Sequence, residues 1–265
     1  GSEMCIRDSY WLDALDVRVS VGSTGNAGIG NYASLGLVGS TQYNGEAGWV
    51  LTQPSNEELG WEKQIQTNVG FSASIFSRFN FEFNFYHRKT KDMLMEVPLP
   101  YTTGFTSQMM NVGELSNRGV ELSASYDIIK RKDLLVSVRA NYAYNTNQID
   151  KLFYGKTEWP MPDYLMNYKV GESLNYYMPI YAGVDKNDGA PMWYKKGHKG
   201  GVVHEFNPET MTKDASNMDA LNQDTGKKRF APHTGGFGLT AQWKGFTLSS
   251  DFAFVAGKYM VNNAY

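Results

Sequence analysis

Three groups of residues in this sequence have the side-chain types that a chemical site needs: the histidines, one acidic loop and a glycine-rich stretch. Asp185 to Gly189 (DKNDG) resembles the start of a calcium loop, but Gly189 falls where a side-chain ligand is needed, and Lys196 takes the place of the usual glutamate. A polar turn is therefore the preferred interpretation of this loop. The four histidines show no metal-ligand spacing such as H-x-x-x-H: His87, His198, His204 and His233.

The glycine-rich stretch Gly22–Asn31 (GSTGNAGIGN) is the next candidate, for a phosphate-binding loop. Its glycines match neither the dinucleotide fingerprint nor the Walker pattern, and no amphipathic helix follows them. The stretch is interpreted as the exit of a strand. The single cysteine, Cys5, excludes a disulfide within the chain and a cysteine-based metal site. We therefore predict no enzyme, no cofactor and no metal.

The bulk composition excludes several classes of protein. A net charge of -2 and a pI near 6.1 give no general attraction to nucleic acid. A mean hydropathy of -0.44, without an apolar run of 18 residues, excludes helical membrane spans. Membrane barrels are not excluded, because their strands alternate apolar and polar residues. Aromatic residues at 14% and 27 glycines suit a β-protein.

The elements that must position any site are strands, and the hairpin from Ile65 to Tyr86 shows them most clearly. Phe79, Phe81, Phe83 and Phe85 alternate with polar residues, so each face of this strand has one character. Only Ser77-Arg78 separates the two halves of the hairpin, and strands of about ten residues suit a tilted membrane crossing. Five further strands are predicted, at Leu15–Val21, Val120–Tyr126, Leu134–Tyr144, Phe237–Trp243 and Phe246–Phe254.

Long and short connections alternate along the chain. We expect a short strand in Ala33–Tyr43 with a tight turn at Asn44-Gly45, irregular structure over Val97–Asn117, and little regular structure over Thr146–Thr234. The basic run His87–Lys91 is interpreted as a solvated strand end at a membrane rim. Long loops on one side and short turns on the other are typical of outer-membrane barrels. The predicted fold is all-β, a partial transmembrane antiparallel up-and-down β-barrel with long extracellular loops and short periplasmic turns.

Two features of the chain set its expected domain organisation. Residues 1–9 (GSEMCIRDS) have no period and are interpreted as a foreign segment, so that the barrel domain covers residues 10–265. Seven strands are an odd number and do not make a usual closed barrel, so we expect part of a larger one.

Four segments resemble the C-terminal barrel region of SusC/RagA-type TonB-linked (TonB-dependent) outer-membrane transporters. They are Trp11–Asn31 with the following Tyr32–Leu35, Leu59–Lys63 (LGWEK), Tyr86–Met93 with Val97–Leu122, and Tyr181–Asp185 with Gly189–Tyr194. The resemblance implies part of a roughly 22-stranded barrel of the plugged size class, with the plug, TonB box and final strands missing. It also implies the outer membrane of a Gram-negative bacterium as the location, contact with its lipid, and import of oligosaccharides or peptides. The implied partners are TonB, through the missing N-terminal region, and a SusD-like surface lipoprotein.

Two alternatives stay open, a porin-like or adhesive outer-membrane protein and a soluble β-rich carbohydrate-binding module. The second predicts that the phenylalanines of the hairpin are buried in protein.

Two sets of site residues are predicted. Charged residues expected to face a barrel lumen are Glu82, Glu121, Arg139 and Asp251. Loop aromatics that could stack on sugars or peptide side chains are Tyr101, Phe105, Trp159, Tyr164, Tyr176, Tyr177, Trp193 and Tyr194.

Overall fold

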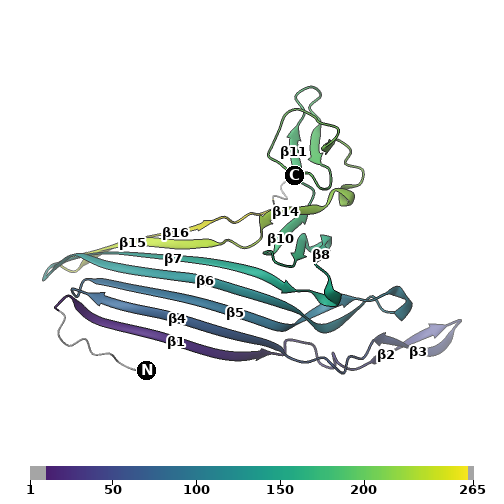
Figure 1. Cartoon of the computed structure of the whole chain (residues 1–265), viewed down its shortest axis with the longest axis horizontal. Helices are drawn as coiled ribbons and strands as arrows, with labels where there is room; N and C mark the ends of the chain where they lie inside the picture. The colour runs from purple at the N-terminus through teal and green to yellow at the C-terminus, as the bar shows by residue number, and fades with distance from the viewer. Residues whose placement is uncertain (1–9, 262–265) are drawn as a thin grey trace.

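The computed structural model describes residues 10–261, which are organised around one large antiparallel sheet (Figure 1). The segment predicted to be foreign, residues 1–9, lies outside the described residues. Seven strands form the sheet in the order β1-β4-β5-β6-β7-β15-β16. Their bounds are β1 Leu12–Asn26, β4 Glu62–Ile75, β5 Phe79–Pro98, β6 Ser107–Arg131, β7 Leu134–Lys151, β15 His233–Trp243 and β16 Phe246–Ala256.

All seven predicted strands lie in this sheet, and the register aligns their apolar residues. Val19 pairs with Val69, which pairs with Phe85, and Phe85 pairs with Val120 on the next strand. Residues opposite each other on neighbouring strands share a face, so this row places one apolar residue from each of four strands on the same side. The apolar face is open: Val17 is 65% exposed and Phe252 57% exposed.

The short and long connections lie at opposite ends of the sheet, as predicted (Figure 1). Short turns join β4 to β5 at Phe76–Arg78, β6 to β7 at residues 132–133, and β15 to β16 at Lys244-Gly245. The first turn is one residue longer than predicted, because Phe76 and Ser77 both take left-handed backbone angles, with φ of 52° and 51°. Chain reversal at this end therefore needs few residues, and the other end holds nearly all of the loop structure.

Two predictions about β5 and its connection to β6 need correction. Most of the region Val97–Asn117 is strand, because β5 runs to Pro98 and β6 starts at Ser107, and residues 99–106 form the connection between them. Register shifts between Thr90 and Leu94, next to Asp92 with a φ of 55°, interrupt the alternation that revealed the strands. For the same reason His87–Lys91 lies inside β5 and not at its end.

The two other loop regions contain small sheets. The first has β2 (Leu37–Tyr43) and β3 (Glu46–Gln53), which confirm the predicted strand and its Asn44-Gly45 turn and add an unpredicted second strand. The region Thr146–Thr234 is more regular than predicted. It contains the end of β7, the start of β15 and seven short strands in two sheets: β8 Glu158–Met161, β9 Met166–Lys169, β10 Asn175–Met178, β11 Tyr181–Val184, β12 Pro191–Tyr194, β13 Met211–Thr212 and β14 Gln223–Lys228.

The buried apolar side chains gather at the loop end of the molecule. One cluster joins β5 and β7 to a short 3-10 helix, η2 (Phe153–Gly155), and consists of Met95, Val97, Ile149, Leu152 and Phe153. A second lies within the β11-β12-β13 sheet and its loops and consists of Ala182, Met192, Tyr194 and Met211. No helix among residues 10–261 is both long and apolar enough to cross a membrane.

Candidate functional site

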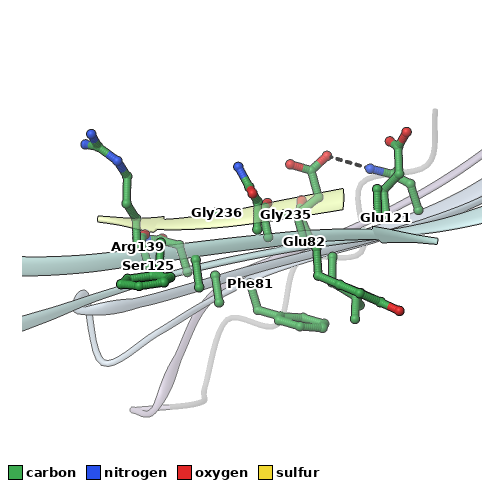
Figure 2. Close-up of a pocket in the computed structure, with 18 of the residues that line it drawn as sticks. Phe81, Glu82, Glu121, Ser125, Arg139, Gly235 and Gly236 are labelled. Atoms are coloured by element: carbon green, nitrogen blue, oxygen red, sulfur yellow. Dashed lines mark hydrogen bonds between the residues drawn. The ribbon is translucent and has the colours of Figure 1, made fainter. Parts of the chain in front are cut away.

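The polar face of the large sheet brings the four predicted charged residues, Glu82, Glu121, Arg139 and Asp251, to one surface. Glu82 pairs with Ser123 on β6, Glu121 pairs with Asn84 on β5, and each pair shares a face. Figure 2 shows Glu82, Glu121 and Arg139 on one side of the ribbon and Phe81 on the other. The four side chains line a hollow of about 1150 Å³ that spans the strands of the sheet.

Arg139 and Asp251 form an ion pair across an intervening strand. Arg139 on β7 and Asp251 on β16 are both register partners of Gly238, which lies on β15 between them. Arg139 Nη2 lies 2.5 Å from Asp251 Oδ1 and 2.6 Å from Oδ2. A Cβ at position 238 would overlap Asp251 Oδ1 and lie 3.0 Å from Arg139 Nε. The pair therefore depends on the absence of a side chain at Gly238.

Arg18 on β1 and Glu82 on β5 form a second ion pair across β4, on a diagonal, because the register partner of Glu82 is Ser72. Arg18 on β1 pairs in register with Gly70 on β4, and Gly70 pairs with Asn84 on β5. Arg18 Nη2 reaches over β4 to donate to Glu82 Oε1 at 2.6 Å. Asn84 Nδ2 donates to the same oxygen at 3.2 Å, and a dashed line at Glu82 in Figure 2 marks this second bond. A Cβ at Gly70 would overlap Asn84 Oδ1. On the polar face, each of these two ion pairs therefore links two strands across the strand that lies between them.

Glu121 differs from the other three charged residues. Within residues 10–261, no lysine, arginine or histidine nitrogen lies within 4.0 Å of its carboxylate, and the residue is exposed. The face therefore offers one free carboxylate beside amides such as Asn84 and Asn141, which suits hydrogen bonding to a polar or cationic group. No cluster of three or more histidine, cysteine, aspartate or glutamate residues in the described part of the chain could hold a metal ion.

The predicted loop aromatics are not brought together into one site. Tyr101 belongs to the 3-10 helix η1 (Tyr101–Thr103) at the β5–β6 connection, where it is 92% exposed, and Phe105 follows it, half-buried. Tyr164 ends another 3-10 helix, η3 (Pro162–Tyr164), and is 62% exposed. The remaining five lie on the short strands of two separate sheets: Trp159 on β8, Tyr176 and Tyr177 on β10, and Trp193 and Tyr194 on β12.

Several of these aromatic rings pack inside the loops. Trp159 meets the ring of Phe153 edge-on at a centroid distance of 4.8 Å, in the cluster that joins β5 and β7. Tyr177 is 8% exposed and Tyr194 6% exposed, and Tyr194 Oη donates to the carbonyl of Gly201 at 2.9 Å. Tyr177 and Tyr194 present little surface to a ligand and Trp159 is half-buried, whereas Tyr101 and Tyr164 present most of their rings.

The loop Asp185–Gly189 is a polar turn whose two aspartates both form ion pairs with Lys213. The Gly189 amide donates to the Asp185 carbonyl at 2.9 Å, and the Asn187 amide donates to Asp185 Oδ1 at 3.0 Å. Lys213 Nζ lies 2.5 Å from Asp185 Oδ2 and 2.7 Å from Asp188 Oδ2. These hydrogen bonds lower the pKa of both carboxyl groups and raise the pKa of Lys213. An ammonium group therefore lies between the two carboxylates.

The residues that sequence reasoning missed are Arg18, Gly70, Asn84 and Gly238, which complete the two ion pairs. The sequence does contain a pattern that indicates the two glycines. Each is a polar-face residue of a strand whose two neighbouring strands carry charged residues on the same face. Reading that signal requires the register, which the sequence pattern fixes only to within a shift of two residues.

Comparison with known proteins agrees with this architecture. Residues 10–263 match the family described as "TonB dependent receptor-like, beta-barrel". The chain is 35% identical over 160 residues to TonB-dependent receptor P3 of Formosa agariphila, covering 57% of this chain and 16% of that protein. It is 34% identical over 163 residues to TonB-dependent receptor SusC of Bacteroides thetaiotaomicron, covering 58% of this chain and 16% of SusC.

Solved structures are similar over nearly the whole chain. The RagAB peptide transporter matches with a TM-score of 0.83 at 39% identity, covering 98% of this chain and 28% of that chain. The RagAB peptide importer in its "open-open" state matches with a TM-score of 0.83 at 38% identity and the same coverage. The chain thus spans less than a third of the proteins that it matches. It belongs to the SusC/RagA-type TonB-dependent receptors, and it forms part of their β-barrel.

Proposed function

We propose that this chain is part of an outer-membrane active importer of oligosaccharides or peptides in a Gram-negative bacterium. The observation that supports this best is the similarity to the RagAB peptide importer, which extends over 98% of the chain with a TM-score of 0.83. In this proposal TonB supplies the energy through the N-terminal part of the whole protein. A SusD-like surface lipoprotein assists it at the extracellular loops.

The two faces of the sheet support a membrane location. Val17, Val19, Leu248 and Phe252 on the apolar face are each more than half exposed, so this face needs a covering of lipid. The opposite face, with Glu82, Glu121, Arg139 and Asp251, is then the lumenal one, where water and polar cargo are found. The exposed apolar face disfavours a soluble binding module, in which these side chains would be buried in protein.

The loop aromatics that remain accessible are the candidate cargo contacts. Tyr101 and Tyr164 expose most of their rings, which suits stacking on a sugar face or a peptide side chain. Half-buried Phe105, Tyr176 and Trp193 are second candidates. The relatives named above are receptors and transporters, and we assign no catalytic step to the chain.

Uptake by cells tests this proposal. A strain that lacks the whole gene is supplied with a fluorescently labelled oligosaccharide mixture or a labelled peptide mixture, with and without a working TonB. We expect loss of uptake of one mixture, restored by the intact gene only when TonB is present. Uptake that is unchanged in the deletion strain, or that is restored without TonB, would contradict active import.

A further inference from the structure

The apolar face of the sheet continues toward the loop end into a group of basic residues, which we call the rim cluster: Lys63, His87, Lys89, Lys91 and Arg118. Phe85, His87, Lys89 and Lys91 are spaced two residues apart on β5, so they share one face. His87 pairs in register with Arg118, and Lys91 pairs with Lys63. The rim cluster therefore lies directly beyond the apolar row of Phe85 and Val120, on the same side of the sheet.

Two of the lysines already have carboxylate partners on the same side. Lys89 Nζ lies 3.0 Å from Glu114 Oε2 and 3.8 Å from Asp150 Oδ2. Lys63 Nζ lies 3.6 Å from Asp92 Oδ2. These pairs hold part of the positive charge in place and leave it less available to a ligand.

Lys91 and Arg118 are the available cations of the rim cluster. Both residues are exposed, and among residues 10–261 no carboxylate lies within 4.0 Å of either cationic group. Arg118 is next to the apolar row, and Lys91 lies two rows further toward the loops. At about 3.4 Å per residue, the rows of His87 and Lys91 are roughly 14 Å apart. The two charges thus suit a headgroup that carries more than one phosphate.

We infer that the rim cluster binds the phosphate groups of a membrane lipid whose acyl chains lie on the apolar face below it. This inference rests on the membrane location proposed above. A lipid fits because one molecule presents both chemistries in the order that the sheet presents them, acyl chains beside Phe85 and Val120 and anionic groups beside Arg118 and Lys91. Guanidinium binds phosphate with two parallel hydrogen bonds, and lysine contributes a point charge. The cluster lies at the end of the long connections, which places the lipid in the outer leaflet.

Native mass spectrometry of the full-length protein in neutral detergent tests the inference. The probe is bisphosphorylated lipid A, compared with the same lipid after enzymatic removal of its phosphates. The variant is Lys91→Gln with Arg118→Gln, and its matched control is Arg131→Gln with Lys132→Gln, which removes two exposed charges at the short-turn end of the strands. We expect the rim variant to bind lipid A roughly 10- to 30-fold more weakly than the unaltered protein, with little change in the control.

Three outcomes would overturn the inference: equal binding by the rim variant and the control, equal binding of the two lipids to the unaltered protein, or full displacement of lipid A by an excess of inorganic phosphate. The comparison of the two lipids needs no variant, so it can refute the inference even if the double substitution impairs folding. Cargo uptake by the same variants is measured separately. If the rim variant loses lipid binding but still takes up cargo, the rim cluster binds lipid without being needed for import. The uptake result in the gene-deletion strain tests the proposed function and does not test lipid binding.

Discussion

Arg139 and Asp251 meet directly above Gly238, although a whole strand separates the strands to which they belong. Arg18 and Glu82 also meet across an intervening strand, but on a diagonal, because Arg18 pairs in register with Gly70 and Glu82 pairs with Ser72. Both ion pairs are more than 40% exposed on each side, so each is worth at most about 1 kcal/mol. A slip of one residue in the register of either strand would move one charge to the other face of the sheet and separate the pair.

The first prediction concerns the glycine beneath an ion pair. Gly238→Val should lower the free energy of unfolding by about 1–3 kcal/mol, because its side chain occupies the space that Asp251 fills. The matched control is Gly22→Val on β1, where an added Cβ meets no atom within 4 Å. Urea unfolding of the full-length protein in lipid vesicles measures both. Equal losses would show that strand geometry, and not the ion pair, requires the glycine.

The second prediction concerns the two faces of β5. Phe83→Arg should cost roughly 2–4 kcal/mol if the residue faces lipid near the middle of the membrane. Glu82→Gln, one position away on the polar face, should cost at most about 1 kcal/mol, because it weakens only an exposed ion pair with Arg18. The same unfolding measurement compares them. Similar losses for both variants would refute the assignment of the faces.

The third prediction concerns the ion pairs of Lys213 with Asp185 and Asp188, which we call the Lys213 bridge, and the pH range over which they stabilise the fold. The lowered pKa values of Asp185 and Asp188 mean that their contribution is complete above about pH 4 and is lost as the pH falls through the folded-state values. The raised pKa of Lys213 means that its contribution is complete below about pH 10 and is lost as the pH rises through its folded-state value. Stability from the bridge should therefore be constant between these limits.

Hydrogen exchange of β11, β12 and β13 in the unaltered protein and in Lys213→Met, compared at each pH, measures this contribution. The comparison cancels the intrinsic pH dependence of exchange. We expect greater protection in the unaltered protein near neutral pH and a smaller difference below pH of about 4. A difference that grows as the pH falls would show that the bridge does not act through its charges.

The fourth prediction separates cargo contacts from packing residues. Tyr101→Ala and Tyr164→Ala remove exposed rings and should reduce cargo uptake without changing stability. Tyr194→Ala removes a buried ring and its hydrogen bond to Gly201, and should destabilise the loop by about 2–4 kcal/mol. Uptake assays and thermal unfolding together distinguish the two classes. Unchanged uptake in both exposed-ring variants would remove them from the proposed site.

The large sheet could be predicted from the sequence because its strands have one apolar and one polar face. This pattern identified all seven strands, including the hairpin at Lys244-Gly245. The parts of β5 and β6 nearest the long connections could not be predicted in this way. There the bulge at Lys91–Asp92 shifts the alternation, and residues such as Met95 and Val97 are buried against a loop, so the two faces no longer differ.

The site could be predicted only in part. The shared face of Glu82, Glu121, Arg139 and Asp251 follows from alternation, whereas the pairing of Arg139 with Asp251 depends on a register that alternation does not determine. The aromatic residues were predicted from their residue type and their position in the long loops, which do not distinguish a packed Tyr194 from an exposed Tyr101. Short strands such as β12 have too few residues to show a period.

The cluster of Met95, Val97, Ile149, Leu152 and Phe153 has a mechanical consequence. It packs the loop ends of β5 and β7 against one loop, whereas apolar side chains of the sheet such as Val17 and Phe252 are more than half exposed in the described part of the chain. In the proposed membrane location, a change in membrane thickness would act on the exposed apolar face of the sheet and leave this buried cluster intact. We expect the cluster to tilt as a rigid body when the sheet bends, so that the height and angle of its loop report the state of the surrounding membrane.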